Sequence, residues 1–279
     1  MSKLVNLLKW SATLGKEPQT FLGAKWIEVF LENLSEPKKR LWALRVLSFS
    51  PHYFIAPEKP QYKNLSNEEY LEAAFRDLAS SRADIYEFIL KNYLEKNFAV
   101  LDYGCGPGFL SKIVAPHVRK IYACDISTGA LACARILNGA PNLEYILAVD
   151  AGMKSIADNS LDAVFSFAMV QHISDEVFDA ILENCRRLLK PSGCLILHTQ
   201  LDENERWRTE DEWKRDASLQ GKIKYRYGLH CFARPPKAQT ERVARHGFAN
   251  IEIKPVSDFT DKNFDDICSQ HLLTARKTI

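Results

Sequence analysis

Three glycines at every second position follow a short apolar run and could form a ligand-binding turn. Gly104, Gly106 and Gly108 lie in VLDYGCGPGFLS, directly after a run that ends in Asp102. Glycine has no Cβ atom, so a ligand can approach such a turn closely and meet backbone N–H groups at the start of the next helix. The spacing differs from the dinucleotide pattern G-x-G-x-x-G, because Phe109 stands at the third glycine's place. The turn indicates a dinucleotide or a nucleoside with a charged tail.

Two further acids end predicted strands and could bind the rest of a nucleoside. Asp125 closes the run KIYACD, where a carboxylate can accept both ribose hydroxyls or cap the helix that follows. Asp150 follows LEYILAV, where a side-chain acceptor suits the exocyclic amine of adenine. With the glycine turn, these acids predict a nucleoside site at the carboxyl ends of neighbouring strands.

Alternating strands and helices must position these residues. From Phe98 onward, five runs rich in aliphatic and aromatic residues are expected as strands: FAVLDY, KIYACD, LEYILAV, LDAVFSF and CLILHT. Among the intervening helical segments is SDEVFDAILENCRRLLK, with Ser174 as its N-cap. The alternation predicts a mostly parallel sheet with helices on both faces. The last two runs, FANIEIKPV and QHLLTARK, are expected to form an antiparallel pair at one edge.

The first 80 residues differ from the rest, with almost no glycine and with apolar residues at helical spacing. We expect residues 1–80 to form a helical extension or cap, and residues 81–279 to form the ligand-binding domain. SNEEYLEAAFRDL predicts a helix capped by Ser66, and SSRADIYEFILKNYL predicts another. LVNLLKW could pack on its own domain, or lie on a membrane or a partner.

Composition limits the class of protein. The chain has 279 residues, a formal net charge of +2 and 46% hydrophobic residues, which is ordinary for a globular protein and does not indicate nucleic-acid binding. Seven scattered cysteines without a C-x-x-C pair predict reduced thiols in a cytoplasmic protein, with neither disulfides nor a zinc or other metal site. No apolar run approaches the roughly 18 residues of a membrane span. The oligomeric state is not indicated.

The order and spacing of five motifs match those of a known protein family. The motifs are VLDYGCGPG, CDIS, VDAG, NSLDAVFSFAMVQHISD and LLKPSG. Over about residues 82–279 the chain resembles the class I S-adenosylmethionine-dependent methyltransferases, specifically the group that acts on small molecules. The resemblance implies a Rossmann-like, doubly wound α/β fold with a seven-stranded sheet, mostly parallel with one antiparallel edge strand. It also implies S-adenosylmethionine as the cofactor.

The resemblance assigns the cofactor-binding residues from one end of the cofactor to the other. The methionine part would lie against Asp102, Gly104, Cys105 and Gly106, and the ribose against Asp125. The adenine would lie against Ile126, Asp150 and the backbone of Ala151. The cofactor's amino group would meet the backbone near Phe167, and its carboxylate would meet Arg82, unless that arginine is a solvated surface residue.

Two histidines fall in segments expected to face the transferred methyl group. Methyl transfer needs an acceptor atom in line with the S–CH₃ bond at about 3 Å, and a hydroxyl acceptor must also lose its proton. His172 lies just after the fourth predicted strand and could be the base or a structural residue. His230 lies in an insertion of about residues 200–235, an expected aromatic lid, and is the favoured base. Tyr225 and Tyr227 are the alternatives.

The sequence sets some subclasses aside. Magnesium-dependent catechol-type enzymes would carry an acid just after the fourth strand, where Ala168 and Met169 stand. The leading interpretation is a small-molecule O-methyltransferase, and the nearest alternative is a C-methyltransferase of a quinone-like or lipidic ring. An NAD(P)-dependent oxidoreductase and a non-catalytic cofactor-binding partner are alternatives from other classes. The aromatic residues of RVLSFSPHYF could roof the site and favour a bulky, apolar acceptor.

Overall fold

A seven-stranded sheet lies at the centre of the protein. The computed structural model describes residues 25–48, 59–149, 153–201, 208–226, 230–232, 234–260 and 270–278. The strand order is β3-β2-β1-β4-β5-β7-β6. The strands are β1 (Ala99–Tyr103), β2 (Lys120–Asp125), β3 (Leu143–Leu147), β4 (Leu161–Ser166), β5 (Leu189–Thr199), β6 (Phe248–Pro255) and β7 (His271–Lys277).

The sheet is parallel except at one strand. Strands β1 to β5 pair in parallel, and β7 runs antiparallel to both of its neighbours, β5 and β6. The expected antiparallel pair at one edge is therefore confirmed, with β6 outermost and β7 beside it. The order reverses between β1 and β4, so the carboxyl ends of these two strands flank the crevice where ligands of such sheets bind.

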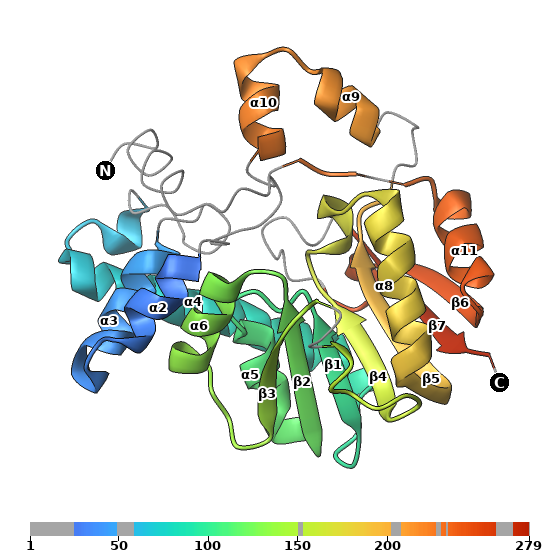
Figure 1. Cartoon of the computed structure of the whole chain (residues 1–279), viewed down its shortest axis with the longest axis horizontal. Coiled ribbons are helices and arrows are strands. Elements are labelled where there is room, and N and C mark those ends of the chain that lie inside the picture. Colours follow the sequence, from blue (N-terminus) through green and yellow to red (C-terminus); the bar gives the residue numbers. More distant parts are fainter. Residues whose placement is uncertain are drawn as a thin grey trace.

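Helices cover both faces of the sheet (Figure 1). The helices at the sheet are α4 (Asn67–Phe88), α5 (Phe109–Val114), α6 (Thr128–Leu137), α8 (Asp175–Leu188) and α11 (Pro236–Arg245). One core joins α4 and α5 to the sheet, and a second core joins α8 and α11 to its opposite face. The expected doubly wound α/β fold is confirmed.

Two further pairs of helices lie outside these layers. The helices α2 (Lys25–Glu32) and α3 (Glu36–Leu47) pack on α6, where Ala132, Cys133 and Leu137 join their apolar side chains. The helices α9 (Glu210–Arg215) and α10 (Leu219–Arg226) belong to the insertion after β5 and stand above the edge where β5 ends (Figure 1). None of the described helices combines the length and the apolar character that a membrane span needs.

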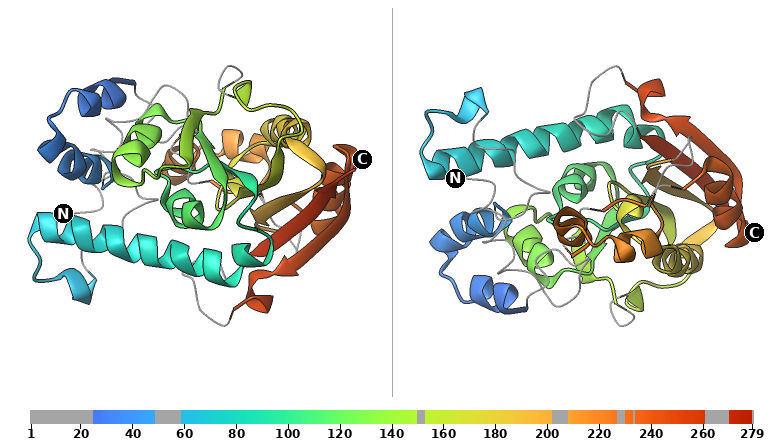
Figure 2. Two further views of the ribbon diagram at one scale, coloured as in Figure 1. Left: turned by 90° about the horizontal axis from the view of Figure 1, so that it is seen from below. Right: turned by 90° about the horizontal axis from the view of Figure 1, so that it is seen from above.

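The helix α4 is longer than the sequence suggests. Ser66 caps it in a capping box with Glu69, as expected, but the helix continues to Phe88 instead of ending for a second one. It crosses residue 80 without a break because no glycine or proline interrupts it. Figure 2 shows α4 as the long helix that runs along one side of the sheet.

Candidate functional site

The glycine turn between β1 and α5 has the expected strand–turn–helix geometry. Gly104, Gly106 and Gly108 have φ angles of 78°, 53° and 76°, a region that favours glycine. A Cβ atom on Gly104 would lie 2.6 Å from Cγ of Met169, which follows β4. The turn therefore requires glycine both for its backbone and because the segment after β4 packs directly against it.

Hydrogen bonding in this turn differs from the expectation that its N–H groups face a ligand. The N–H groups of Gly104 and Cys105 both donate to the carbonyl of Cys124, at 2.8 and 2.9 Å. The N–H of Gly106 donates to the carboxylate of Asp125 at 2.9 Å. These donors are already used within the protein, so the expectation is wrong for these three groups. With these donors bonded, the group beside the turn that can attract a ligand is the carboxylate of Asp125, which suits a cationic or hydroxyl group better than a phosphate.

Asp125 lies at the end of β2 beside this turn. Its second oxygen accepts the N–H of Ser127 at 2.8 Å. Burial raises the pKa of its carboxyl group, although the backbone hydrogen bonds lower it by a smaller amount. A carboxylate has about four acceptor positions, and the backbone N–H groups of Gly106, Ser127 and Ile126 use three of them, which leaves one for a hydroxyl group such as that of a ribose. Ile126 follows it with 51% of its surface exposed, an apolar side chain available to a flat ring.

Asp102 places a second acid under the turn. Its side chain is buried and accepts a hydrogen bond from the Ser111 hydroxyl at 2.5 Å. Burial, with a smaller contribution from the charge of Asp125, raises the pKa of Asp102 to about 7. The Cys105 thiol stays neutral because burial raises its pKa well above the ordinary value. Two acids thus make this end of the sheet suited to a positively charged ligand.

The segment after β4 contacts β5 through an imidazole that the sequence interpretation missed. Ala168, with a φ angle of 57°, donates its N–H to Nδ1 of His198 at 3.1 Å. The ring of Phe167 stacks on that of His198, with 5.5 Å between the centroids. His198 could have been noticed as a titratable residue in the last part of the apolar run CLILHT, at a strand's carboxyl end.

The two candidate histidines lie together, but in different roles. Nδ1 of His172 lies 2.8 Å from the backbone carbonyl of His230. A carbonyl only accepts, so Nδ1 carries the proton and Nε2 has the lone pair. Burial lowers the pKa of His172, and the bond to the carbonyl opposes that shift.

The His230 ring is fully buried among aromatic side chains. The rings of Trp213, Tyr225 and Phe232 have centroids 4.8 to 5.9 Å from it. Among the described residues, neither ring nitrogen has a hydrogen-bond partner of normal geometry, and burial lowers the pKa of His230 to about 4.

Hydrogen bonds dock the insertion onto the segment after β4. The N–H of Phe232 donates to the carbonyl of Gln171 at 2.6 Å. The indole of Trp213, on α9, donates to the carbonyl of Cys231 at 3.2 Å. Residues 230–232 therefore lie along the 3-10 turn η4 (Val170–His172), and the insertion itself supplies the contact that orients His172.

Of the remaining candidates, only Arg82 can be described. It is half-buried on α4, donates to the Ser81 hydroxyl at 3.2 Å, and its charge lowers the pKa of His198. Asp150, Ala151 and Tyr227 lie outside the described residues.

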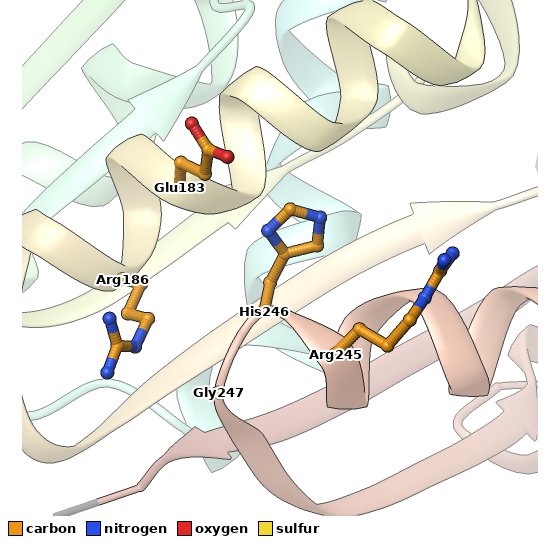
Figure 3. Close-up of a pocket in the computed structure, with 5 residues that line it drawn as sticks. All are labelled: Glu183, Arg186, Arg245, His246 and Gly247. Atoms are coloured by element: carbon orange, nitrogen blue, oxygen red, sulfur yellow. The ribbon is translucent and has the colours of Figure 1, made fainter.

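A separate pocket opens between α8 and α11 (Figure 3). Its volume is about 390 Å³, and it is lined by Glu183, Arg186, Arg245, His246 and Gly247. It lies at the amino ends of the parallel strands, because Phe248 pairs with Lys277 while Thr199, at the other end, pairs with His271. This pocket is therefore remote from the glycine turn.

Comparison with known proteins agrees with this geometry. Residues 101–197, which run from β1 through most of β5, match a family described as a methyltransferase domain. They form a class I S-adenosylmethionine-dependent methyltransferase domain. S-Adenosylmethionine is the cofactor of this family.

Curated relatives of this methyltransferase domain act on different atoms. The ubiquinone biosynthesis O-methyltransferase of Xanthomonas oryzae pv. oryzae (strain PXO99A) is 39% identical over 106 residues, which is 36% of this chain and 42% of that protein. The N-demethylindolmycin N-methyltransferase of Streptomyces griseus is 32% identical over 108 residues, 37% of this chain and 45% of that protein. The match thus spans under half the length of these relatives.

Solved structures share the fold of the methyltransferase domain at low identity. Phosphoethanolamine N-methyltransferase 2 of Haemonchus contortus superposes with a TM-score of 0.51 at 19% identity, over 70% of this chain and 53% of that chain. An S-adenosylmethionine-dependent methyltransferase of Mesorhizobium loti gives 0.51 at 17% identity, over 71% of this chain and all of that chain. Such identities establish the fold alone.

Proposed function

We propose that this protein is an enzyme that transfers a methyl group from S-adenosylmethionine to an oxygen atom of a small molecule. The observation that carries the proposal is the acidic character of the turn, where Asp102 and Asp125 lie beside the glycines. A pyrophosphate would meet two carboxylates there, and three N–H groups of the turn are already bonded, which disfavours an NAD(P)-dependent oxidoreductase. When bound, S-adenosylmethionine supplies an electrophilic methyl group.

The residues of the chain would hold the cofactor in the order that the sequence suggests. Asp102 and the backbone of Gly104, Cys105 and Gly106 would meet the cationic methionine part. Asp125 would accept a ribose hydroxyl, and Ile126 would pack on the adenine. The assignments of Phe167 and Arg82 to the amino and carboxylate groups, and of residues 150 and 151 to the adenine edge, remain predictions.

We infer that His172 is the better of the two candidate bases. Its Nε2 lone pair could accept a proton from an acceptor hydroxyl, while Nδ1–H stays bonded to the His230 carbonyl. The ring of His230 is enclosed by aromatic side chains, and a pKa of about 4 makes it a weak base. His230 would then act through its backbone, and its ring would help to exclude water.

Oxygen is the acceptor atom that this arrangement supports best. A neutral imidazole lone pair is useful for a hydroxyl group, which must lose a proton as it is methylated. The name of the Xanthomonas relative, an O-methyltransferase, points the same way, whereas the Streptomyces relative is an N-methyltransferase. A C-methyltransferase of an activated ring stays the alternative, because it too would deprotonate its acceptor.

The parts around the domain would complete the enzyme. We propose that the residues before α4 form a cap, which is shorter than the expected 1–80 because α4 crosses residue 80, and that the insertion of about 200–235 forms a lid whose aromatic side chains suit an apolar acceptor. The six described cysteines are unpaired, which supports a cytoplasmic location.

Single-turnover assays of two variants test the assignment of the base. The assays use a panel of hydroxylated aromatic acceptors and S-adenosylmethionine. His172→Ala should lower the rate of methyl transfer about 100- to 10,000-fold without lowering the affinity for S-adenosylhomocysteine. His230→Ala keeps the backbone carbonyl and should cost less than His172→Ala. A His172→Ala protein of normal rate, beside an inactive but folded His230→Ala protein, would restore His230 as the base.

A further inference from the structure

His198 presents a buried hydrogen-bond donor that nothing in the described structure uses. It is the penultimate residue of β5 and is 0% exposed. Its Nδ1 accepts the N–H of Ala168, and its Nε2 is buried without a hydrogen-bond partner among the described residues. Buried polar groups in folded proteins are nearly always paired, so such an atom calls for an explanation.

The contact with Ala168 determines which nitrogen carries the proton. A backbone N–H can only donate, so Nδ1 is the acceptor and Nε2 carries the hydrogen. Burial and, to a smaller extent, the nearby charge of Arg82 lower the pKa of His198 to about 3, so the ring stays neutral at physiological pH. Nε2 is therefore a fixed N–H donor without an acceptor in the described part of the chain.

The fold places Arg82 on the same face of the sheet. Alternate residues of a strand share a face, and Ile196 packs with Ile85 and Tyr86 of α4, so His198 also lies on the α4 side. Arg82 lies one helical turn before these two residues. Because α4 ends shortly before β1 begins, that turn lies toward the carboxyl ends of the strands, where His198 is.

The position of β5 points to the methyl acceptor rather than to the cofactor. The proposed cofactor-binding residues follow β1 and β2. On the side of β1 away from β2, β5 is the second strand, at about 10 Å from β1. His172, the proposed base, follows β4 and is close enough for its charge to affect His198. A donor and a proposed base therefore lie in the same region, after the ends of β4 and β5.

We propose that His198 and Arg82 form a subsite for a carboxylate group of the methyl acceptor, so that Arg82 serves the acceptor instead of the carboxylate of the cofactor. One carboxylate oxygen would accept from Nε2–H of His198, and the guanidinium of Arg82 would compensate the negative charge. The inference rests on the proposed function and names the class of its substrate, a small acid. Nε2 has no exposed surface, so binding requires local movement of the side chains that cover it.

Titration calorimetry of the full chain with bound S-adenosylhomocysteine tests the subsite. The probes are benzoate and benzamide, a neutral molecule of the same shape. Benzoate should bind the wild-type protein at least tenfold more tightly than benzamide. His198→Phe should remove that preference, and His198→Gln, whose amide N–H can replace Nε2–H, should restore part of it.

A matched control is His117→Phe, an exposed histidine before β2 at the opposite ends of the strands, which should leave both probes unaffected. Equal affinities of wild-type protein for the two probes, or a preference that survives in His198→Phe, would overturn the subsite. Weaker binding of S-adenosylhomocysteine by the His198→Phe protein would also overturn the subsite, because Nε2 would then contact the cofactor. If the wild-type protein binds no S-adenosylhomocysteine, the proposed function itself fails.

Discussion

Asp102 should make the affinity for S-adenosylmethionine depend on pH between 6 and 8. Its carboxyl group is 2% exposed, and burial raises its pKa to about 7. Without ligand, this group therefore holds a proton below pH 7 and loses it above. The cofactor brings a sulfonium and an ammonium group, which favour the ionised carboxylate. At low pH the proton must leave when the cofactor binds, so affinity should rise as pH rises.

The expected change in cofactor affinity follows from the pKa of Asp102. With a pKa of about 7, roughly 9% of the carboxyl groups are ionised at pH 6 and roughly 91% at pH 8. If the cofactor binds the ionised form, affinity rises about tenfold over this range, or about 1.4 kcal/mol. The variant Asp102→Asn keeps an oxygen that can accept from Ser111 but cannot titrate, so it should lack this rise.

Titration calorimetry at pH 6, 7 and 8, in two buffers of different ionisation enthalpy, measures both the affinity and the protons released. The amino group of the cofactor and His172 also titrate, but they are present in both proteins, so the difference between wild type and Asp102→Asn isolates Asp102. A wild-type affinity that changes less than twofold, or the same rise in Asp102→Asn, would show that ionisation of Asp102 does not control cofactor binding.

Three substitutions test other contacts. Asp125→Ala should weaken the cofactor at least about tenfold in calorimetry, and also lower the stability because its backbone partners lose their acceptor; unchanged affinity would show that the ribose lies elsewhere. Gly104→Ala forces a side chain to a φ angle of 78° and against Met169, and denaturant unfolding should show a loss of about 1–3 kcal/mol. Trp213→Phe keeps a ring but removes the donor to Cys231, so kcat should fall a few-fold with cofactor affinity unchanged. A normal kcat would mean that docking of the insertion does not orient the base.

The sequence predicted the parts of the site that local patterns determine. The strand, the glycine turn and Asp125 follow from apolar runs, residue spacing and the lack of a Cβ atom, and the structure has them where expected. The two predicted helices around Ser80 are one helix, because serine residues weaken a helix without ending it.

Contacts between distant segments could not be predicted in this way. The N–H groups of the glycine turn meet Cys124 and Asp125 on the next strand, so the pairing of β1 with β2 determines what the turn offers a ligand. Likewise, His172 and His230 are 58 residues apart in the sequence. Which of the two imidazoles can serve as a base depends on how the insertion docks.

The central claim is that the acidic glycine turn binds S-adenosylmethionine. The most direct test is titration calorimetry of the purified full chain with S-adenosylmethionine, and separately with NADH. We predict saturable binding of one S-adenosylmethionine per chain, displaced by S-adenosylhomocysteine and unaffected by NADH. Saturable binding of NADH, with no heat from S-adenosylmethionine, would contradict the account.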